Sequence, residues 1–381
     1  MKRIPMFLDG TWNEPDDNTN VWRSELLVCD TDAEGNAQEP YYQVGVGTKR
    51  FERLSGAALG TGLDAHLRDA YQWLMSRYDD GDKIYLFGFS RGAYTARSLA
   101  GLISKCGLLL PGASFSVPEI FERYRKGDKV PPLYQLTSGR YPRELWKRED
   151  RWLTEQSRRV TIEFIGVWDT VGSLGIPVGK LSGLSRKSHF FHTTTPSDLY
   201  RHMYQALAID ENRGSYQAAL WTLFQPEGGP EPKLEPYQTL EQRWFVGAHC
   251  NVGGGYKNDV LAQIPLAWML EKATAAGLRF KRELTLKGDE HLGEPVDSYA
   301  RFLGGLYRVV KFGRRHYRTI ARPRVPTKKR PGWSYSINET IDASVFDRWR
   351  SIPSYRPRNL AEWAKRHNVK LEDLKGDWHS S

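Results

Sequence analysis

The chain has 381 residues, a formal net charge of +10 and 40% hydrophobic residues, so it can build one large α/β domain or two domains with an ordinary core. Its three cysteines, Cys29, Cys106 and Cys250, are too scattered for a disulfide framework or a metal knuckle. The sequence has no His-Glu-x-x-His motif, EF-hand loop or P-loop. We therefore expect no metal and no cofactor.

The amino-terminal apolar run is broken by Asp9 and is too short for a signal peptide. No stretch reaches the length of a membrane-spanning helix. We expect a soluble chain made in the cytoplasm, with export by a route that needs no cleaved signal left open. The basic excess, much of it beyond residue 279, suits peripheral contact with an anionic membrane or a merely solvated surface, and we expect no nucleic acid partner.

In chain order, residues 5–8 predict a short strand that ends at Asp-Gly-Thr-Trp-Asn, residues 9–13. Residues 41–47 predict a second strand. The glycine-rich run at 56–62 is interpreted as a flexible turn, because it lacks the ending of a P-loop. Apolar residues then recur at helical spacing over 63–78, which predicts a helix.

The best-defined stretch is 83–97. After Lys83, residues 84–87 are apolar and aromatic and predict a buried strand, whereas residues 93–105 predict a helix. Between them lies Gly-Phe-Ser-Arg-Gly at 88–92, a G-x-S-x-G motif in the strand-turn-helix context that gives it meaning. So tight a turn strains Ser90 and requires Gly88 and Gly92 where the backbone is crowded.

Residues 110–159 change character and predict a mostly helical insertion, either a lid over the site or a surface helix pair without a gating role. Further strands are expected at 160–168 and 243–246, with a helix at 261–276, whereas 199–208 reads as helical or extended. Beyond residue 278 the alternation fades into an irregular, basic region. We expect a catalytic domain over 1–277 and an extension over 278–381 packed on or beside it.

Three expected strands end at chemically useful groups, in the order Ser90, Asp169 and His249. This is the nucleophile–acid–base order of α/β-hydrolases. A serine hydroxyl needs a base within hydrogen-bond reach, and a carboxylate on the other imidazole nitrogen fixes the tautomer. Asp210 also ends an apolar run and stays the alternative acid. Asp259 is a weaker candidate.

An oxyanion hole for this chemistry would use the backbone N–H of Arg91, with a second donor from Gly10 or Thr11 in the loop after the first strand. Asp9, in the same loop, is expected to order it by accepting N–H groups. Binding of a cation is the less common alternative.

Five motifs, at 9–13, 88–93, 166–172, 208–213 and 245–256, together resemble one family. It is the α/β-hydrolase family that includes the type VI secretion phospholipase effectors, and the resemblance covers about residues 3–275. It implies a mostly parallel sheet with helices on both faces and a serine esterase or phospholipase mechanism with Ser90, Asp169 and His249 as triad. It also implies an immunity protein as a partner if the chain is an effector.

We therefore expect a serine hydrolase of lipid carboxylic esters, of phospholipase A type, that works through an acyl-enzyme. The alternatives are a soluble esterase or thioesterase on a small acyl substrate and a catalytically silent binding or scaffold protein. The sequence leaves open the acyl chain length, the head group, the position cleaved, the oligomeric state and the choice between an effector and a housekeeping role.

Overall fold

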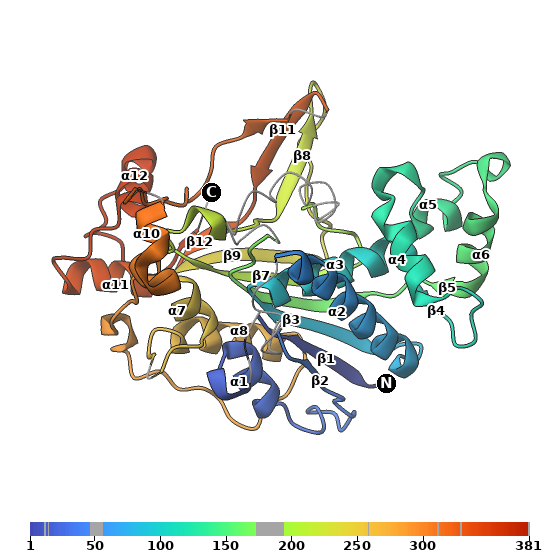
Figure 1. The fold of residues 1–381 in the computed structure, drawn as a ribbon, viewed down its shortest axis with the longest axis horizontal. Coiled ribbons are helices and arrows are strands. Elements are labelled where there is room, and N and C mark those ends of the chain that lie inside the picture. Colours follow the sequence, from blue (N-terminus) through green and yellow to red (C-terminus); the bar gives the residue numbers. More distant parts are fainter. Residues whose placement is uncertain are drawn as a thin grey trace.

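Eight strands pair into a central sheet in the order β13-β12-β9-β7-β6-β3-β1-β2 (Figure 1). The computed structural model describes residues 1–10, 13, 15–45, 56–172, 194–257, 259–310, 312–327 and 330–379. Neighbouring strands run parallel except β12 and β13, so the predicted mostly parallel sheet is confirmed. The strands are β1 Arg3–Leu8, β2 Tyr41–Gln43, β3 Lys83–Phe89, β6 Ile162–Trp168, β7 Tyr200–Ala208, β9 Thr239–Phe245, β12 Glu339–Ile341 and β13 Trp378–His379.

Helices cover both faces of this sheet (Figure 1). Helices α2 (Gly56–Arg77) and α3 (Arg91–Cys106) pack on one face, and α1 (Asn20–Leu27) and α8 (Gln263–Ala275) on the other. The reason lies in strand β3, where alternate side chains point to opposite faces. Ile84 and Leu86 join the first cluster, whereas Tyr85 and Phe87 join the second.

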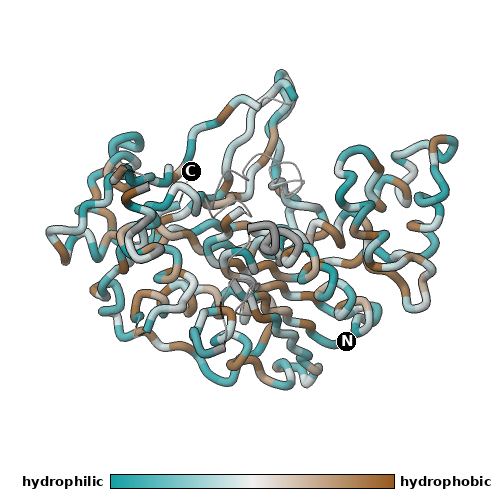
Figure 2. Tube along the Cα trace, in the orientation of Figure 1, coloured by the Kyte–Doolittle hydropathy of each residue, from teal (hydrophilic) through white to brown (hydrophobic). Residues whose placement is uncertain are grey.

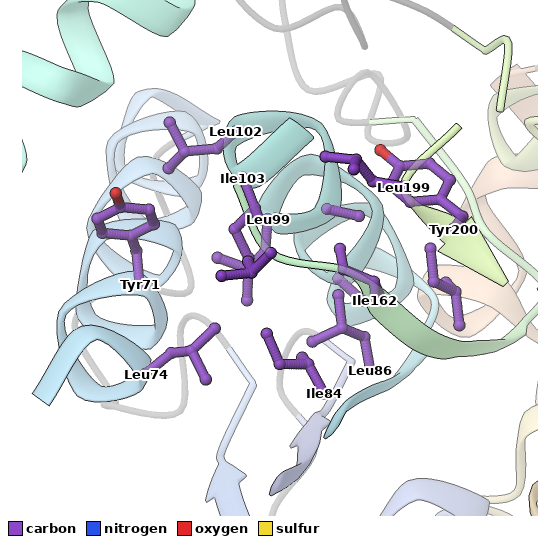
Figure 3. Close-up of a cluster of buried hydrophobic side chains, with 14 of the residues drawn as sticks. Tyr71, Leu74, Ile84, Leu86, Leu99, Leu102, Ile103, Ile162, Leu199 and Tyr200 are labelled. Carbon is purple, nitrogen blue, oxygen red and sulfur yellow. The ribbon is translucent and has the colours of Figure 1, made fainter. Parts of the chain in front are cut away.

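Figure 3 shows the first cluster, in which Tyr71 and Leu74 of α2 and Leu99 of α3 lie over Ile84 and Leu86. Along the chain, hydrophobic colouring recurs in the central strands and is sparser towards the outer loops (Figure 2). Because the buried strands carry apolar residues on both faces, the sheet is held rigidly, and groups at its strand ends are held with it.

The structure corrects one expectation about local structure and decides another that the sequence left open. Residues 56–62, expected as a turn, belong to helix α2, which runs over 22 residues. Each glycine inside a helix costs about 1 kcal/mol relative to alanine, a cost that the packing of a long helix offsets. Residues 200–208, left open between helix and strand, form β7.

The helical insertion is present and lies at one end of the sheet (Figure 1). It contains α4 (Val117–Arg125), α5 (Leu133–Thr137) and α6 (Arg148–Gln156), and the short strands β4 (Leu108–Leu109) and β5 (Ser157–Arg158) pair at its base. A buried ion pair between Arg123 and Asp150, 2.6 Å long, ties α4 to α6. Whether the insertion acts as a lid stays a prediction.

The carboxyl-terminal region is more regular than expected. It adds β12 and β13 to the central sheet, and its helices are α9 (Ser298–Arg301), α10 (Leu306–Val310), α11 (Ala343–Ser351) and α12 (Arg358–His367). Strands β10 (Val325–Pro326) and β11 (Gly332–Ser336) form a second sheet with β8 (Thr222–Pro226). Strands of two to five residues are too short to give a periodic signal, so the sequence suggested an irregular region.

Short helix α7 (His249–Gly253) follows β9 and completes the elements that carry the site. No helix among the described residues combines the length and apolarity needed to cross a bilayer.

Candidate active site

Ser90 lies on the sharp turn between β3 and α3. Its backbone adopts φ 58° and ψ −119°, a conformation that costs a non-glycine residue about 1–3 kcal/mol and persists only where the surroundings enforce it. Here the Ser90 N–H donates to the Trp168 carbonyl at 3.0 Å, and the Tyr94 N–H donates to the Ser90 carbonyl at 3.2 Å. The strain predicted from the motif is therefore present, and the turn directs the Ser90 hydroxyl towards His249 at the end of the strand.

The two motif glycines make this turn sterically possible. A Cβ on Gly92 would lie 2.0 Å from the Leu8 carbonyl oxygen, and one on Gly88 would lie 2.6 Å from the Gly92 oxygen. Both contacts are with backbone, which cannot rotate away. The motif therefore packs α3 directly against the end of β1.

Replacing Gly92 by alanine is expected to destabilise the protein by about 3 kcal/mol or more, because overpacking against backbone shifts whole elements. Urea unfolding followed by circular dichroism would measure the loss. Gly172→Ala is the matched control, since nothing lies within 4 Å of a Cβ at Gly172. Equal midpoints for the two variants would contradict the crowding argument.

His249 meets Ser90 on one side and Asp169 on the other. Its Nε2 lies 2.8 Å from Ser90 Oγ and its Nδ1 lies 2.5 Å from Asp169 Oδ2. All three side chains are buried. The imidazole packs between the rings of Phe89 and Tyr216, with centroid separations of 4.6 and 5.0 Å. The structure thus brings together the three residues that the sequence selected from separate strand ends.

Burial and neighbouring charges set the protonation states of His249 and Asp169. Burial lowers the pKa of His249, and its contact with Asp169 offsets only part of that effect. Burial alone raises the pKa of Asp169, but the Arg318 guanidinium and His249 outweigh it and hold that pKa well below its ordinary value. At neutral pH the arrangement therefore holds a neutral imidazole next to an ionised carboxylate, the state that a general base requires.

The two alternative acids lie elsewhere. The Asp210 carboxylate accepts the Gly247 N–H at 2.7 Å and the Tyr355 hydroxyl at 3.1 Å. Asp259 accepts the Asn251 side-chain amide at 3.0 Å. Neither carboxylate is within hydrogen-bond distance of the His249 ring, so geometry favours Asp169. Asp210 instead fixes the turn that leads into His249.

The structure places the expected oxyanion-hole donors differently from one another. The Arg91 N–H opens helix α3 directly after Ser90, where the helix itself offers no acceptor. Gly10 lies against the serine, since a Cβ there would come 3.2 Å from Ser90 Cβ, but its N–H donates to the Asp9 carboxylate at 2.6 Å. Gly10 is thus engaged in this structure. Thr11 lies outside the described residues.

The Asp9 carboxylate accepts hydrogen bonds at the end of β1, as an aspartate at a turn commonly does. Besides Gly10, its carboxylate accepts the Thr19 hydroxyl at 2.6 Å and the Tyr42 hydroxyl at 2.9 Å. Burial raises the pKa of Asp9 and these donors oppose that effect. The carboxylate therefore fastens the end of β1 to α1 and β2 beside Ser90.

Sequence reasoning missed the charged groups that lie behind Ser90, His249 and Asp169. Glu211 accepts the His249 backbone N–H at 3.3 Å and forms a buried ion pair with Arg213 at 2.8 Å. Arg318 contacts Asp169 at 2.5 Å. Glu211 and Arg213 lie in the motif at 208–213, so the sequence does carry a signal for them. Arg318 carries no local signal, because only the fold brings it to the site.

Comparisons with known proteins show which family the chain resembles. The family model described as T6SS, Phospholipase effector Tle1-like, catalytic domain matches residues 2–272. The uncharacterized protein YEL023C of Saccharomyces cerevisiae is 30% identical over 240 residues, which are 58% of this chain and 33% of that protein. The chain thus spans about a third of the length of this relative.

Two solved structures are similar at low levels. An uncharacterized protein from Pseudomonas aeruginosa aligns with a TM-score of 0.38 and 15% identity over 78% of this chain and 49% of its own. The Tle1 effector bound to the VgrG spike of the type 6 secretion system aligns with a TM-score of 0.36 and 17% identity over 68% and 51%. The family model, which covers most of the chain, decides the assignment: the protein belongs to the family of Tle1-like phospholipase effector catalytic domains.

Proposed function

We propose that this protein is a serine hydrolase that cleaves the carboxylic esters of phospholipids, with phospholipase A specificity, on an α/β-hydrolase fold. The observation that carries the proposal is the continuous contact from Ser90 Oγ through the His249 ring to Asp169. Membership of a phospholipase effector family supports a lipid as the substrate.

The proposed reaction begins with the hydroxyl of Ser90. His249 Nε2, 2.8 Å away, takes its proton as Ser90 Oγ attacks the ester carbonyl. Asp169 on Nδ1 selects the tautomer that leaves Nε2 unprotonated and stabilises the imidazolium that forms. The negative charge on the former carbonyl oxygen meets the Arg91 N–H at the positive end of α3, with Thr11 proposed as second donor.

The imidazolium then returns its proton to the leaving alcohol, a lysophospholipid, and the acyl group stays on Ser90. Water, deprotonated by the same His249 nitrogen, attacks the acyl-enzyme and releases the fatty acid. The imidazolium then gives that proton to Ser90 Oγ as the acyl bond breaks, so every proton passes through one nitrogen atom, Nε2 of His249. That nitrogen belongs to a ring held by Phe89 and Tyr216, so it keeps its place between the two half-reactions.

Product analysis tests the proposal. Vesicles of phosphatidylethanolamine and phosphatidylglycerol with distinguishable acyl chains would be incubated with wild type and with Ser90→Ala. Phospholipase A activity predicts one lysophospholipid and one fatty acid, both dependent on Ser90. Release of a phosphorylated head group, or hydrolysis of short monomeric esters alone, would contradict the assignment and favour another specificity.

The pH dependence should reflect the buried base. Because the pKa of His249 is lowered, the imidazole stays neutral below the ordinary histidine value of about 6.5. The acid limb of kcat/KM is therefore expected below about pH 6.5, measured with a short-chain ester over pH 4 to 9. An acid limb above that value would show that the base is not a desolvated histidine.

A further inference from the structure

Arg318 reaches the candidate active site from the carboxyl-terminal region, outside residues 2–272 that the family model matches. Its side chain is 1% exposed. Nη1 donates to Asp169 Oδ1 at 2.5 Å and Nη2 donates to Oδ2 at 3.0 Å, the paired geometry of a guanidinium on a carboxylate. The same nitrogens donate to the carbonyls of Ala208 at 3.0 Å and Tyr216 at 2.5 Å.

These contacts use the full hydrogen-bonding capacity of the Asp169 carboxylate. Asp169 Oδ1 accepts from Arg318 and from the Ala208 N–H at 3.0 Å, and Oδ2 accepts from Arg318 and faces His249 Nδ1. A carboxylate offers about four lone-pair sites, so none is left over. Rotation of the carboxylate away from His249 would break several contacts at once.

The position of Arg318 leaves one of its own polar atoms without a hydrogen bond. Its Nε is buried and has no hydrogen-bond partner among the described residues, whereas both of its terminal nitrogens donate to Asp169 and to backbone carbonyls. A side chain selected only to fill space would not need a charge here. The two hydrogen bonds to Asp169 explain the orientation of the Arg318 side chain.

The charge matters as well as the contact. Among the described residues, the charged and titratable groups around His249 are the carboxylates of Asp169 and Glu211, the guanidinium of Arg213, the phenol of Tyr216 and, behind Asp169, the guanidinium of Arg318. Glu211 is already paired with Arg213. Arg213 lowers the pKa of His249 directly. Arg318 is the cation that offsets the negative charge of Asp169 itself, so it acts on His249 by weakening the support that this carboxylate gives to the imidazolium.

We propose that Arg318 is a positioning residue of the Ser90–His249–Asp169 group, which fixes the Asp169 carboxylate and tunes the base, so that the carboxyl-terminal region completes the catalytic site. This inference rests on the proposed function. It assigns a catalytic contribution to a segment beyond the family's matched domain.

Two variants of the full chain separate charge from geometry. Arg318→Gln removes the cation, so we expect the acid limb of kcat/KM to move to higher pH by about one unit and kcat to fall by about a hundredfold. Arg318→Lys keeps the cation but loses the paired geometry, so kcat should fall while the acid limb stays close to that of wild type. A short monomeric ester is the substrate.

The control is Arg123→Gln in the insertion, which breaks an equally buried arginine–aspartate pair, 2.6 Å long with both side chains 2% exposed. It should lose stability without moving the acid limb. If the acid limb of Arg318→Gln coincides with that of wild type, Arg318 is only structural and the inference fails. If Arg318→Gln does not fold, the lysine variant decides, and an unchanged kcat overturns the proposal.

A measurement without turnover keeps the two proposals apart. In the Ser90→Ala background, the NMR signals of the His249 imidazole report its pKa, which should rise when Arg318→Gln is added. Wild type that cleaves no ester would refute the proposed function and leave this titration interpretable. Active wild type with an unmoved titration would refute only the role of Arg318.

Discussion

Replacing Ser90 by alanine is expected to lower kcat for ester hydrolysis by about a millionfold, the order seen when a triad nucleophile is removed. The fold should survive, because alanine and serine meet similar strain at φ 58° and the Ser90 hydroxyl contacts His249 rather than a structural partner. Initial rates with a chromogenic short-chain ester and with labelled phospholipid would measure the loss. Mass spectrometry after an organophosphorus probe should find one adduct on wild type and none on the variant.

Ser104 provides the matched control. It lies on helix α3, which follows Ser90, and its hydroxyl donates to Ser197 Oγ at 2.6 Å. Ser104→Ala should therefore keep the rate and the probe adduct of wild type. Equal rates for wild type and Ser90→Ala would remove Ser90 as the nucleophile, whatever the geometry around it.

Much of the site could be predicted because each of its groups follows a strand in a recognisable local pattern. The turn at Ser90 is specified by its own glycines, and His249 precedes a glycine-rich run. The carboxyl ends of parallel strands meet at one edge of a sheet, so residues far apart in sequence could be expected together. Their identity therefore needed only short-range signals.

The choice between Asp169 and Asp210 needed the fold. Both aspartates follow neighbouring strands, β6 and β7, and Asp169 is buried whereas Asp210 is half-buried. What separates them is which one faces the His249 ring, and that depends on the register and turn of each strand. A sequence read in one dimension carries no such information.

Arg318 was out of reach for another reason. It lies in a segment without periodicity, and its partner Asp169 is 149 residues away. The short strands β12 and β13 could not be predicted for a related reason. They form by pairing with strands that the rest of the fold supplies. Contacts that depend on a completed fold leave no local pattern.

Replacing Asp169 by asparagine should cause two separate losses. Catalysis should fall by about 10⁴-fold, because an amide favours the wrong imidazole tautomer and cannot stabilise the imidazolium. Stability should fall too, by about 3–5 kcal/mol, because the variant leaves the Arg318 cation buried without its counter-charge. Steady-state kinetics and urea unfolding at pH 7 measure the two effects on the same preparation.

The sign of the stability effect follows from the lowered pKa of Asp169. A carboxylate whose folded-state pKa is depressed stabilises the protein above the unfolded value, about 3.9, and loses that contribution as the pH falls through the folded value. The penalty of Asp169→Asn should therefore be fully present at pH 7 and should shrink only in strong acid. A penalty that peaks at acid pH would contradict the assigned ion pair.

A double variant separates the two losses. Adding Arg318→Met to Asp169→Asn removes the unpaired cation and keeps an extended apolar stem in its place, so much of the lost stability should return. Activity should not return, because no anion faces His249 Nδ1 in either variant. If the double variant were less stable than Asp169→Asn alone, the buried pair would not be the source of the penalty. If activity recovered with stability, Asp169 would act through the fold and not through the base.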